Sequence, residues 1–333
     1  MKSHTSRSLR GQIIGLVTVL VFGALALFVF IHRQYVVDQV VVWQFQPTSD
    51  IVTLADRTTM TEQGRFVFYA SQPAVEDAAD FNANCGKIEQ SSAVLGCYAH
   101  QRIYVYNVTD SRLDGIRETT IAHEMLHAVY QRLSDSQRQT VNRLVEAEYA
   151  KLQGDKDFSQ RMALYARTEP GERDNELHSI IGTEVASISP QLENYYKQYF
   201  VNRQAVVGFH DAYSSIFADL SARKAELEGK LTSLAAVIDS ETKQYNDDAN
   251  VLNNDAAAFN TRAANNGFSS RAEFDSRRAA LLSRIQSLQA RRGTINANVA
   301  AYQALYAEYE AVAGQTEALN HSIDSTLAPS PSL

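Results

Sequence analysis

The feature that most limits how this chain can fold is an uncharged, largely apolar stretch over residues 11–31. Its length, about twenty residues, is what a helix needs to cross the hydrocarbon core of a bilayer. The residues before it include Lys2, Arg7 and Arg10 and no acidic residue. Because positive charges favour the cytoplasmic side, we expect a single-pass protein of the cell membrane. Residues 1–10 would then be cytoplasmic, and the bulk of the chain would be extracytoplasmic.

A cleaved signal peptide is the alternative interpretation of this stretch. Signal peptides usually have an apolar run of roughly 7 to 15 residues that ends in a small-x-small cleavage site. Residues 11–31 are longer than that and end in Phe28-Val-Phe-Ile31, so we favour an uncleaved signal anchor. The cysteines agree with an exported domain, because the isolated pair Cys85 and Cys97 predicts a disulfide rather than a metal site.

The clearest chemistry in the sequence lies in His123-Glu-Met-Leu-His127. Residues four apart on a helix lie one turn above each other, so both imidazoles can bind one metal ion. Glu124 is placed to accept a proton from water bound to that metal. Apart from Glu124, residues 119–130 carry no charge, which indicates a helix packed inside a domain. These apolar neighbours disfavour the alternative of a chance match on a surface helix.

With these residues the chain resembles the zincin metallopeptidases, whose third zinc ligand comes from a later helix. The metzincin continuation, a glycine and then a histidine, is absent from Ala128-Val-Tyr-Gln-Arg-Leu133. Asn175-Glu-Leu-His-Ser179 is similar to the Asn-Glu-x-x-Ser-Asp segment of thermolysin-like gluzincins, in which the Glu binds zinc. The resemblance implies one Zn²⁺ per chain, held by His123, His127 and Glu176. The sequence departs from the family at Ile180, where gluzincins usually place an acid that supports a ligand histidine.

A second acidic residue competes for the role of third ligand. Glu176 and Glu184 fall on the same face of one predicted helix, about 12 Å apart at a rise of 1.5 Å per residue, so only one can reach the metal. We favour Glu176 because of its Asn-Glu-x-x-Ser context, and Glu184 remains the alternative. His178 points away from this face, which favours a packed or surface histidine. Asp174 or Asn175 is expected to cap the helix.

The segment between the apolar stretch and the metal motif has a β-like composition. Residues 64–70 and 101–108 are rich in β-branched and aromatic side chains, and each has the length of a strand. By resemblance to zincins, residues 101–108 could form the sheet edge that binds substrate backbone, and an interior strand is the other interpretation. Ser134 is expected to cap a helix that reaches Leu152. Residues 32–208 are thus predicted to form an α+β zincin-like metallopeptidase domain.

From residue 209 onward apolar residues recur at heptad spacing on both sides of a turn at residues 263–270. This pattern predicts an antiparallel α-helical hairpin of the coiled-coil type over residues 209–325. Residues 326–333 are expected to form a disordered tail. The arm offers a surface for a protein partner or for self-association.

Composition and motifs narrow the function. A net charge of −7 and the lack of a basic aromatic stretch exclude a typical nucleic-acid-binding protein.

The prediction is a membrane-anchored extracytoplasmic zinc metallopeptidase that hydrolyses peptide bonds in a peptide or protein substrate, with Glu124 as general base toward a zinc-activated water. The alternative is a catalytically inactive zincin-fold scaffold whose coiled-coil arm organises envelope or partner proteins. Intact Glu124 argues against a scaffold, which needs no base. Hydrolysis of other amide bonds, in wall peptides or modified sugars, would use the same site.

Overall fold

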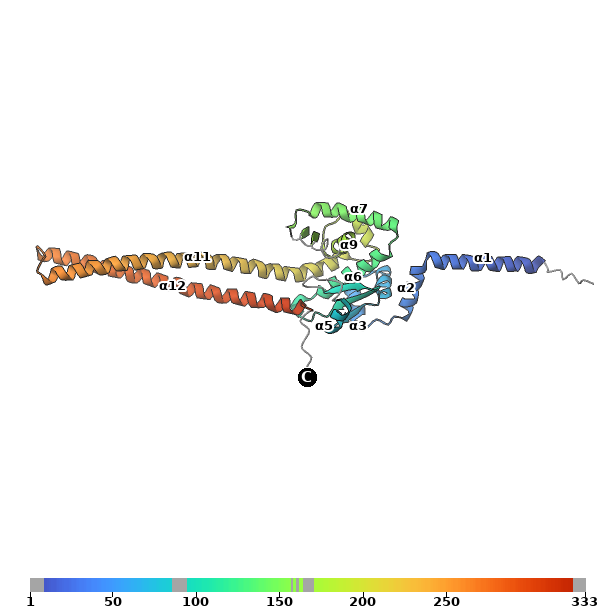
Figure 1. Cartoon of the computed structure of the whole chain (residues 1–333), viewed down its shortest axis with the longest axis horizontal. Coiled ribbons are helices and arrows are strands. Elements are labelled where there is room, and N and C mark those ends of the chain that lie inside the picture. Colours follow the sequence, from blue (N-terminus) through green and yellow to red (C-terminus); the bar gives the residue numbers. More distant parts are fainter. Residues whose placement is uncertain (1–8, 86–94, 157, 160–161, 164–170, 326–333) are drawn as a thin grey trace, which may run out of the picture. The chain divides into compact units, whose positions relative to one another are not determined.

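The computed structural model describes residues 9–85, 95–156, 158–159, 162–163 and 171–325 (Figure 1). The chain divides into two compact units. The first contains the residues up to Ser215 together with the end of the chain from Asn320, and the second runs from Ile216 to Leu319. Most of the predicted cytoplasmic start and the whole predicted disordered tail lie outside the described residues.

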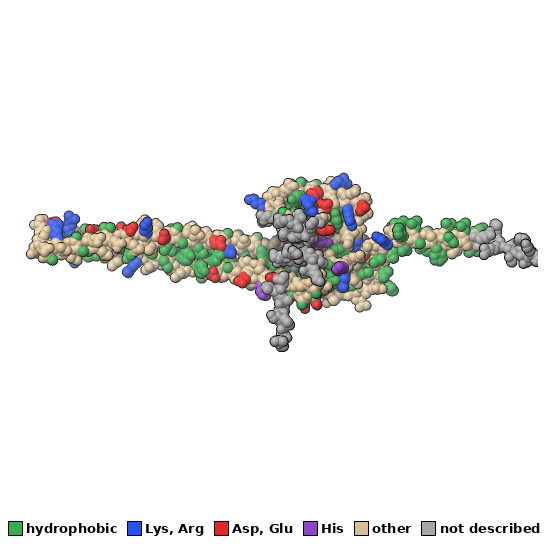
Figure 2. All heavy atoms as spheres, viewed as in Figure 1, with side chains coloured by type: hydrophobic (Ala, Val, Ile, Leu, Met, Phe, Trp, Pro, Cys, Tyr) green, Lys and Arg blue, Asp and Glu red, His purple; other side chains and the backbone are tan. Residues whose placement is uncertain are grey.

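The predicted apolar helix is present as α1 (Leu9–Ile31). Within it, Ile13–Ile31 is long and apolar enough to cross a membrane, and no part of that segment is buried against the rest of the chain. Figure 2 shows hydrophobic side chains along this helix. After His32 the chain continues as α2 (Arg33–Gln44). The direction in which α1 crosses a membrane stays a prediction.

The predicted strand over residues 64–70 is wrong, because these residues form the helix α4 (Glu62–Ala70). The hydroxyl of Thr61 accepts a hydrogen bond from the backbone N–H of Gly64 and caps this helix at its start. Val67 and Phe68 are buried in the main hydrophobic core. β-Branched and aromatic residues favour strands only weakly, so a good cap and a buried helix face decided the conformation here.

The described strands form one small mixed sheet in the order β1-β3-β2. They are β1 (Ala74–Glu76), β2 (Gly96–Ala99) and β3 (Arg102–Tyr106). The predicted strand over residues 101–108 is therefore confirmed as β3, which pairs in parallel with β1 and antiparallel with β2. Because β3 lies between the other two, its interpretation as a sheet edge is wrong and the interior interpretation holds. The edge strand that packs on the metal-motif helix is β2.

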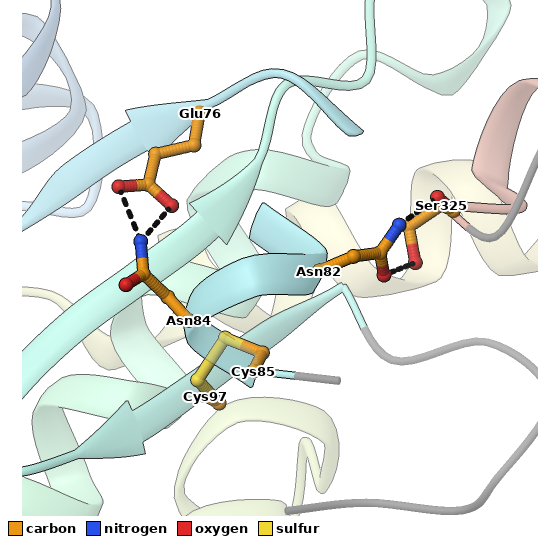
Figure 3. Close-up of a disulfide and its surroundings, with 6 residues drawn as sticks. All are labelled: Glu76, Asn82, Asn84, Cys85, Cys97 and Ser325. Carbon is orange, nitrogen blue, oxygen red and sulfur yellow. Dashed lines mark hydrogen bonds between the residues drawn. A yellow bond between two sulfur atoms is a disulfide. The ribbon is translucent and has the colours of Figure 1, made fainter. Parts of the chain in front are cut away.

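The predicted disulfide between Cys85 and Cys97 is present and joins α5 (Ala78–Cys85) to β2 (Figure 3). Two further contacts hold α5. Asn84 Nδ2 donates hydrogen bonds of 3.1 and 2.9 Å to the carboxylate of Glu76 on β1, and Asn82 Nδ2 donates to the carbonyl of Ser325. The chain end therefore returns to the unit that contains the sheet.

The other elements described in the first unit are helical. They are α3 (Ser49–Arg57), the 3-10 helix η1 (Ser111–Leu113), α6 (Ile116–Arg132), α7 (Asp135–Leu152), α9 (Arg173–Glu184) and α10 (Pro190–Tyr196). The predicted cap at Ser134 is confirmed, since its side chain and that of Gln137 form a reciprocal capping box at the start of α7. The predicted cap of α9 is wrong, because Glu172 occupies that position without a side-chain cap bond.

The predicted helical hairpin agrees with the long helices α11 (Arg203–Ala264) and α12 (Arg271–Ile323). The helix α11 begins earlier than residue 209, and the junction of the two units falls inside it. Polar pairs across the hairpin fix its antiparallel register, and each step of seven residues on one helix is matched by seven on the other. These pairs are Glu241 with Asn298, Asp248 with Arg291, and Asp255 with Arg284.

Candidate metal centre

The three predicted ligands come together from two helices. His123 and His127 lie one turn apart on α6, and Glu176 lies in the first turn of α9. His127 Nε2 is 3.3 Å from Glu176 Oε1, and His123 Nε2 is 3.6 Å from Glu176 Oε2. One ligand atom from each residue falls within 4.8 Å of the others, so the group could hold a metal ion. Two imidazole nitrogens and one carboxylate oxygen are typical of catalytic zinc sites, which keep a fourth position open.

Close packing of α6 against α9 brings Glu176 within reach of the histidines. Both helices bury apolar side chains in the main core, including Met125 and Leu126 on α6 and Ile181 on α9. Gly182 permits the approach, because a Cβ at this position would overlap the Leu126 side chain and lie 2.9 Å from a ring carbon of Tyr196. The position of Glu176 thus depends on a glycine that sequence reasoning did not single out.

His127 is oriented by hydrogen bonds to its second ring nitrogen. Its Nδ1 is 3.0 Å from Asn175 Oδ1 and 3.2 Å from Ser179 Oγ. With the proton on Nδ1 donated to Asn175, Nε2 keeps its lone pair for a metal. Ile180, at the position where gluzincins usually carry an acid, is instead buried in the apolar core. The motif residues Asn175 and Ser179 supply support that the sequence had left unassigned.

The charge balance of this group favours a cation. Glu176 is buried, and its Oε2 has no hydrogen-bond partner among the described residues. Burial raises the pKa of Glu176, but the neighbouring His127 and His123 lower it overall, so the carboxylate is ionised. Burial lowers the pKa of His123, whereas the Glu176 and Glu124 carboxylates raise it to a net value of about 9. A buried carboxylate oxygen without a donor is costly, and a bound metal ion would satisfy it.

Glu124, the predicted base, is buried on α6 beside the edge strand β2. Gly96, the first residue of β2, lies close to α6. A Cβ there would lie 2.8 Å from Glu124 Oε1 and 2.9 Å from its Cγ. The Thr120 methyl group would be closer still, at 2.5 Å, so the absence of a side chain at Gly96 leaves room for both Thr120 and Glu124. The sequence contains little indication of this role for Gly96, because a glycine before Cys97 could equally belong to a turn.

The other candidates lie outside the ligand group. Glu184 Oε2 is 3.4 Å from Nε2 of His210, a residue of α11 that sequence reasoning missed. His178 is buried, and its Nε2 lies 2.9 Å from the Tyr195 hydroxyl, which agrees with the predicted packed histidine. Burial lowers the pKa of His178 to about 3, with a contribution from His127 and His123, so its ring is neutral.

Comparisons with protein-family models, with curated proteins and with solved structures found no match for this chain. The resemblance to zincins therefore rests on the motif residues and on the geometry of this site.

Proposed function

We propose that this chain is a membrane-anchored zinc metallopeptidase with a gluzincin-like site. His123, His127 and Glu176 would hold one zinc ion, and Glu124 would act as general base. The observation that carries the proposal is the convergence of these ligands from α6 and α9, with Glu124 buried on the same helix as the histidines. The Glu176 oxygen that has no hydrogen-bond partner among the described residues and the oriented ring of His127 give further support.

In this proposal the metal site, Glu124 and the edge strand β2 have separate roles in peptide hydrolysis. A bound zinc ion supplies Lewis-acid polarisation of the scissile carbonyl and of the attacking water. Glu124 accepts the proton that this water loses and passes it to the leaving amine. An extended peptide can pair with the edge strand β2 as an added strand, which would place its backbone beside Gly96 and Glu124. The inactive-scaffold alternative has less support, because a scaffold needs neither a buried base nor a glycine that makes room for it.

The proposed location is the outer side of a membrane, with α1 as the anchor and a cytoplasmic amino end. The length and apolar surface of α1 support a membrane anchor. The Cys85–Cys97 disulfide supports an oxidising compartment for the domain that follows. The positive charges before residue 11 support the orientation.

Metal analysis of the full chain in detergent tests the ligand set. We expect one zinc per chain in the wild type, loss of zinc in Glu176→Ala, and retention in Glu184→Ala, which removes a carboxylate of the same helix. Retained zinc in Glu176→Ala, or loss chiefly in Glu184→Ala, would contradict the proposed third ligand.

The variant Glu124→Gln tests the base. It keeps the side-chain volume and the ligands, so we expect full zinc content with hydrolysis of a quenched-fluorescence peptide library reduced by about 10²–10⁴-fold. Glu62→Gln, at an exposed position on α4, serves as the matched control and should behave as wild type. Undiminished hydrolysis by Glu124→Gln would refute the assigned role.

A further inference from the structure

The helix that follows α1 presents apolar side chains outward. In α2, Val37, Val40 and Trp43 are 51%, 47% and 85% exposed, respectively. These residues are three apart, so they share one face that covers about 120° of arc at 100° per residue. We call these three side chains the outer face of α2.

The opposite face of α2 is docked on the domain, and it carries both half-buried apolar residues such as Val42 and a buried charge. Asp38, only 3% exposed, accepts hydrogen bonds of 2.9 Å from both Nε and Nη2 of Arg132 at the end of α6. Gln34 donates to the same carboxylate at 3.0 Å, and Arg132 also donates to the Tyr98 hydroxyl of β2 at 3.1 Å. A helix on the surface of a water-soluble domain has its apolar side turned inward. In α2, apolar side chains point outward as well as inward, so its outer face needs an apolar environment.

The chain itself indicates what that environment is. Only His32 separates α2 from α1, and the backbone bonds from His32 N to Phe28 O and from Val36 N to His32 O link the two helices. If α1 crosses a bilayer, α2 therefore begins where the hydrocarbon ends. Tryptophan is enriched in that interfacial layer, where its ring is apolar and its N–H can reach polar groups. Arg33, at the start of α2, suits the lipid phosphates of the same layer.

We propose that the outer face of α2 lies in the headgroup layer of the bilayer that α1 crosses, and that the Asp38–Arg132 pair fixes the metal centre close to that surface. The inference rests on the membrane anchor proposed above. Arg132 and His127 belong to one helix and are about 7–8 Å apart along its axis at 1.5 Å per residue. The substrates that fit this arrangement are polypeptide segments near the membrane surface.

The sequence provides its own probe, because Trp43 is the only tryptophan in the chain. The full chain is reconstituted into phosphatidylcholine vesicles, either plain or brominated in the upper part of the acyl chain. We expect the Trp43 emission to be strongly quenched in brominated vesicles and to be shielded from aqueous acrylamide. Emission that acrylamide quenches and bromine does not would overturn the proposal.

Two reporter variants distinguish a failure of this proposal from a failure of the proposed membrane anchor. Phe28→Trp combined with Trp43→Phe reports on the part of α1 nearest α2, at the depth of the bromines, and Val201→Trp combined with Trp43→Phe reports on an exposed apolar position of the domain, 74% exposed. We expect bromine quenching for the first and acrylamide quenching for the second. Quenching by bromine in α1 without quenching of Trp43 would refute the docked outer face and leave the anchor standing. No bromine quenching in α1 would refute the anchor itself, and with it the proposal.

One further outcome identifies a different occupant. If Trp43 is shielded from acrylamide yet insensitive to bromine at any protein-to-lipid ratio, protein covers the outer face and the lipid assignment is wrong. Shielding that disappears on dilution of the protein in lipid would identify that cover as a second copy of the chain, and it also overturns the proposal.

Discussion

Charged side chains contribute differently to stability in the two units of the molecule. In the first unit, the buried Arg203 pairs with Glu193 at 2.8 Å and donates to the carbonyls of Val185 and Ala186 at the end of α9. In the hairpin, Arg291 makes one exposed contact with Asp248, which recurs at heptad spacing. The comparison teaches that burial turns a charge into a fixed structural element, whereas an exposed pair mainly marks the register of two helices.

The largest effect is expected from Arg203→Ala. The substitution removes the donors for the last carbonyls of α9 and leaves the carboxylate of Glu193 without its cation. Loss of one partner of a buried pair lowers the free energy of unfolding by about 3–5 kcal/mol. Denaturant unfolding of the first unit, followed by the near-ultraviolet signal of its tyrosines, would measure the loss. Arg203→Lys, which keeps the charge but not the planar fork, should lie in between. A loss as small as that of an exposed ion pair would contradict the assigned role.

Gly96→Ala should come next. The added methyl would lie 2.5 Å from Thr120 Cγ2 and 2.8 Å from Glu124 Oε1, so β2 must move or both side chains of α6 must shift, at about 1–3 kcal/mol of strain. We expect hydrolysis to fall while zinc content stays unchanged, as measured by turnover and metal analysis of the same preparation. Gly208→Ala, where nothing lies within 4 Å of the added carbon, is the control. Equal activity of the two variants would show that Glu124 does not depend on β2.

Asn175→Ala should weaken metal binding without abolishing it. The substitution removes the 3.0 Å partner of His127 Nδ1 and leaves Ser179 to hold the ring. Loss of such a supporting contact typically lowers metal affinity by about 10–100-fold. Competition with a zinc-binding dye would measure the affinity, and Asn202→Ala, at an exposed position, is the matched control. Unchanged affinity in Asn175→Ala would mean that Ser179 alone orients His127.

The smallest effect is expected from Arg291→Ala in the hairpin. Its ion pair with Asp248 is exposed, so its loss should change stability by no more than about 0.5 kcal/mol. Leu227→Ala, which removes a fully buried side chain from the same hairpin, should cost about 2 kcal/mol or more. Thermal unfolding of the helical signal would compare them. If Arg291→Ala were the more harmful, the difference drawn above between the two units would fail.

Sequence reasoning succeeded for features that are formed by residues close together in the sequence. The spacing of His123 and His127, the cap at Ser134, the cysteine pair and the heptad repeat are each visible within a few turns of chain, and each matches the structure. These features depend on neighbours in sequence.

It failed where distant contacts decide the outcome. Residues 64–70 form a helix because of a cap and a buried face, and β3 is interior because β1 and β2 pair along its two sides. Asn175 looked like a helix cap, but its oxygen lies against His127 on another helix. Likewise, nothing near Gly96 in the sequence reveals that it lies against Glu124.

The ligand group also bears on how long the protein survives in its compartment. His127 and Asn175 are 48 residues apart in sequence, and the proposed metal ligand Glu176 follows directly. A metal ion bound to both α6 and α9 would close this loop as a removable cross-link, and its binding free energy would add to that of folding. Chains that meet no metal would then open more often and be degraded sooner. The supply of metal would thus set the abundance of the protein before it sets its activity.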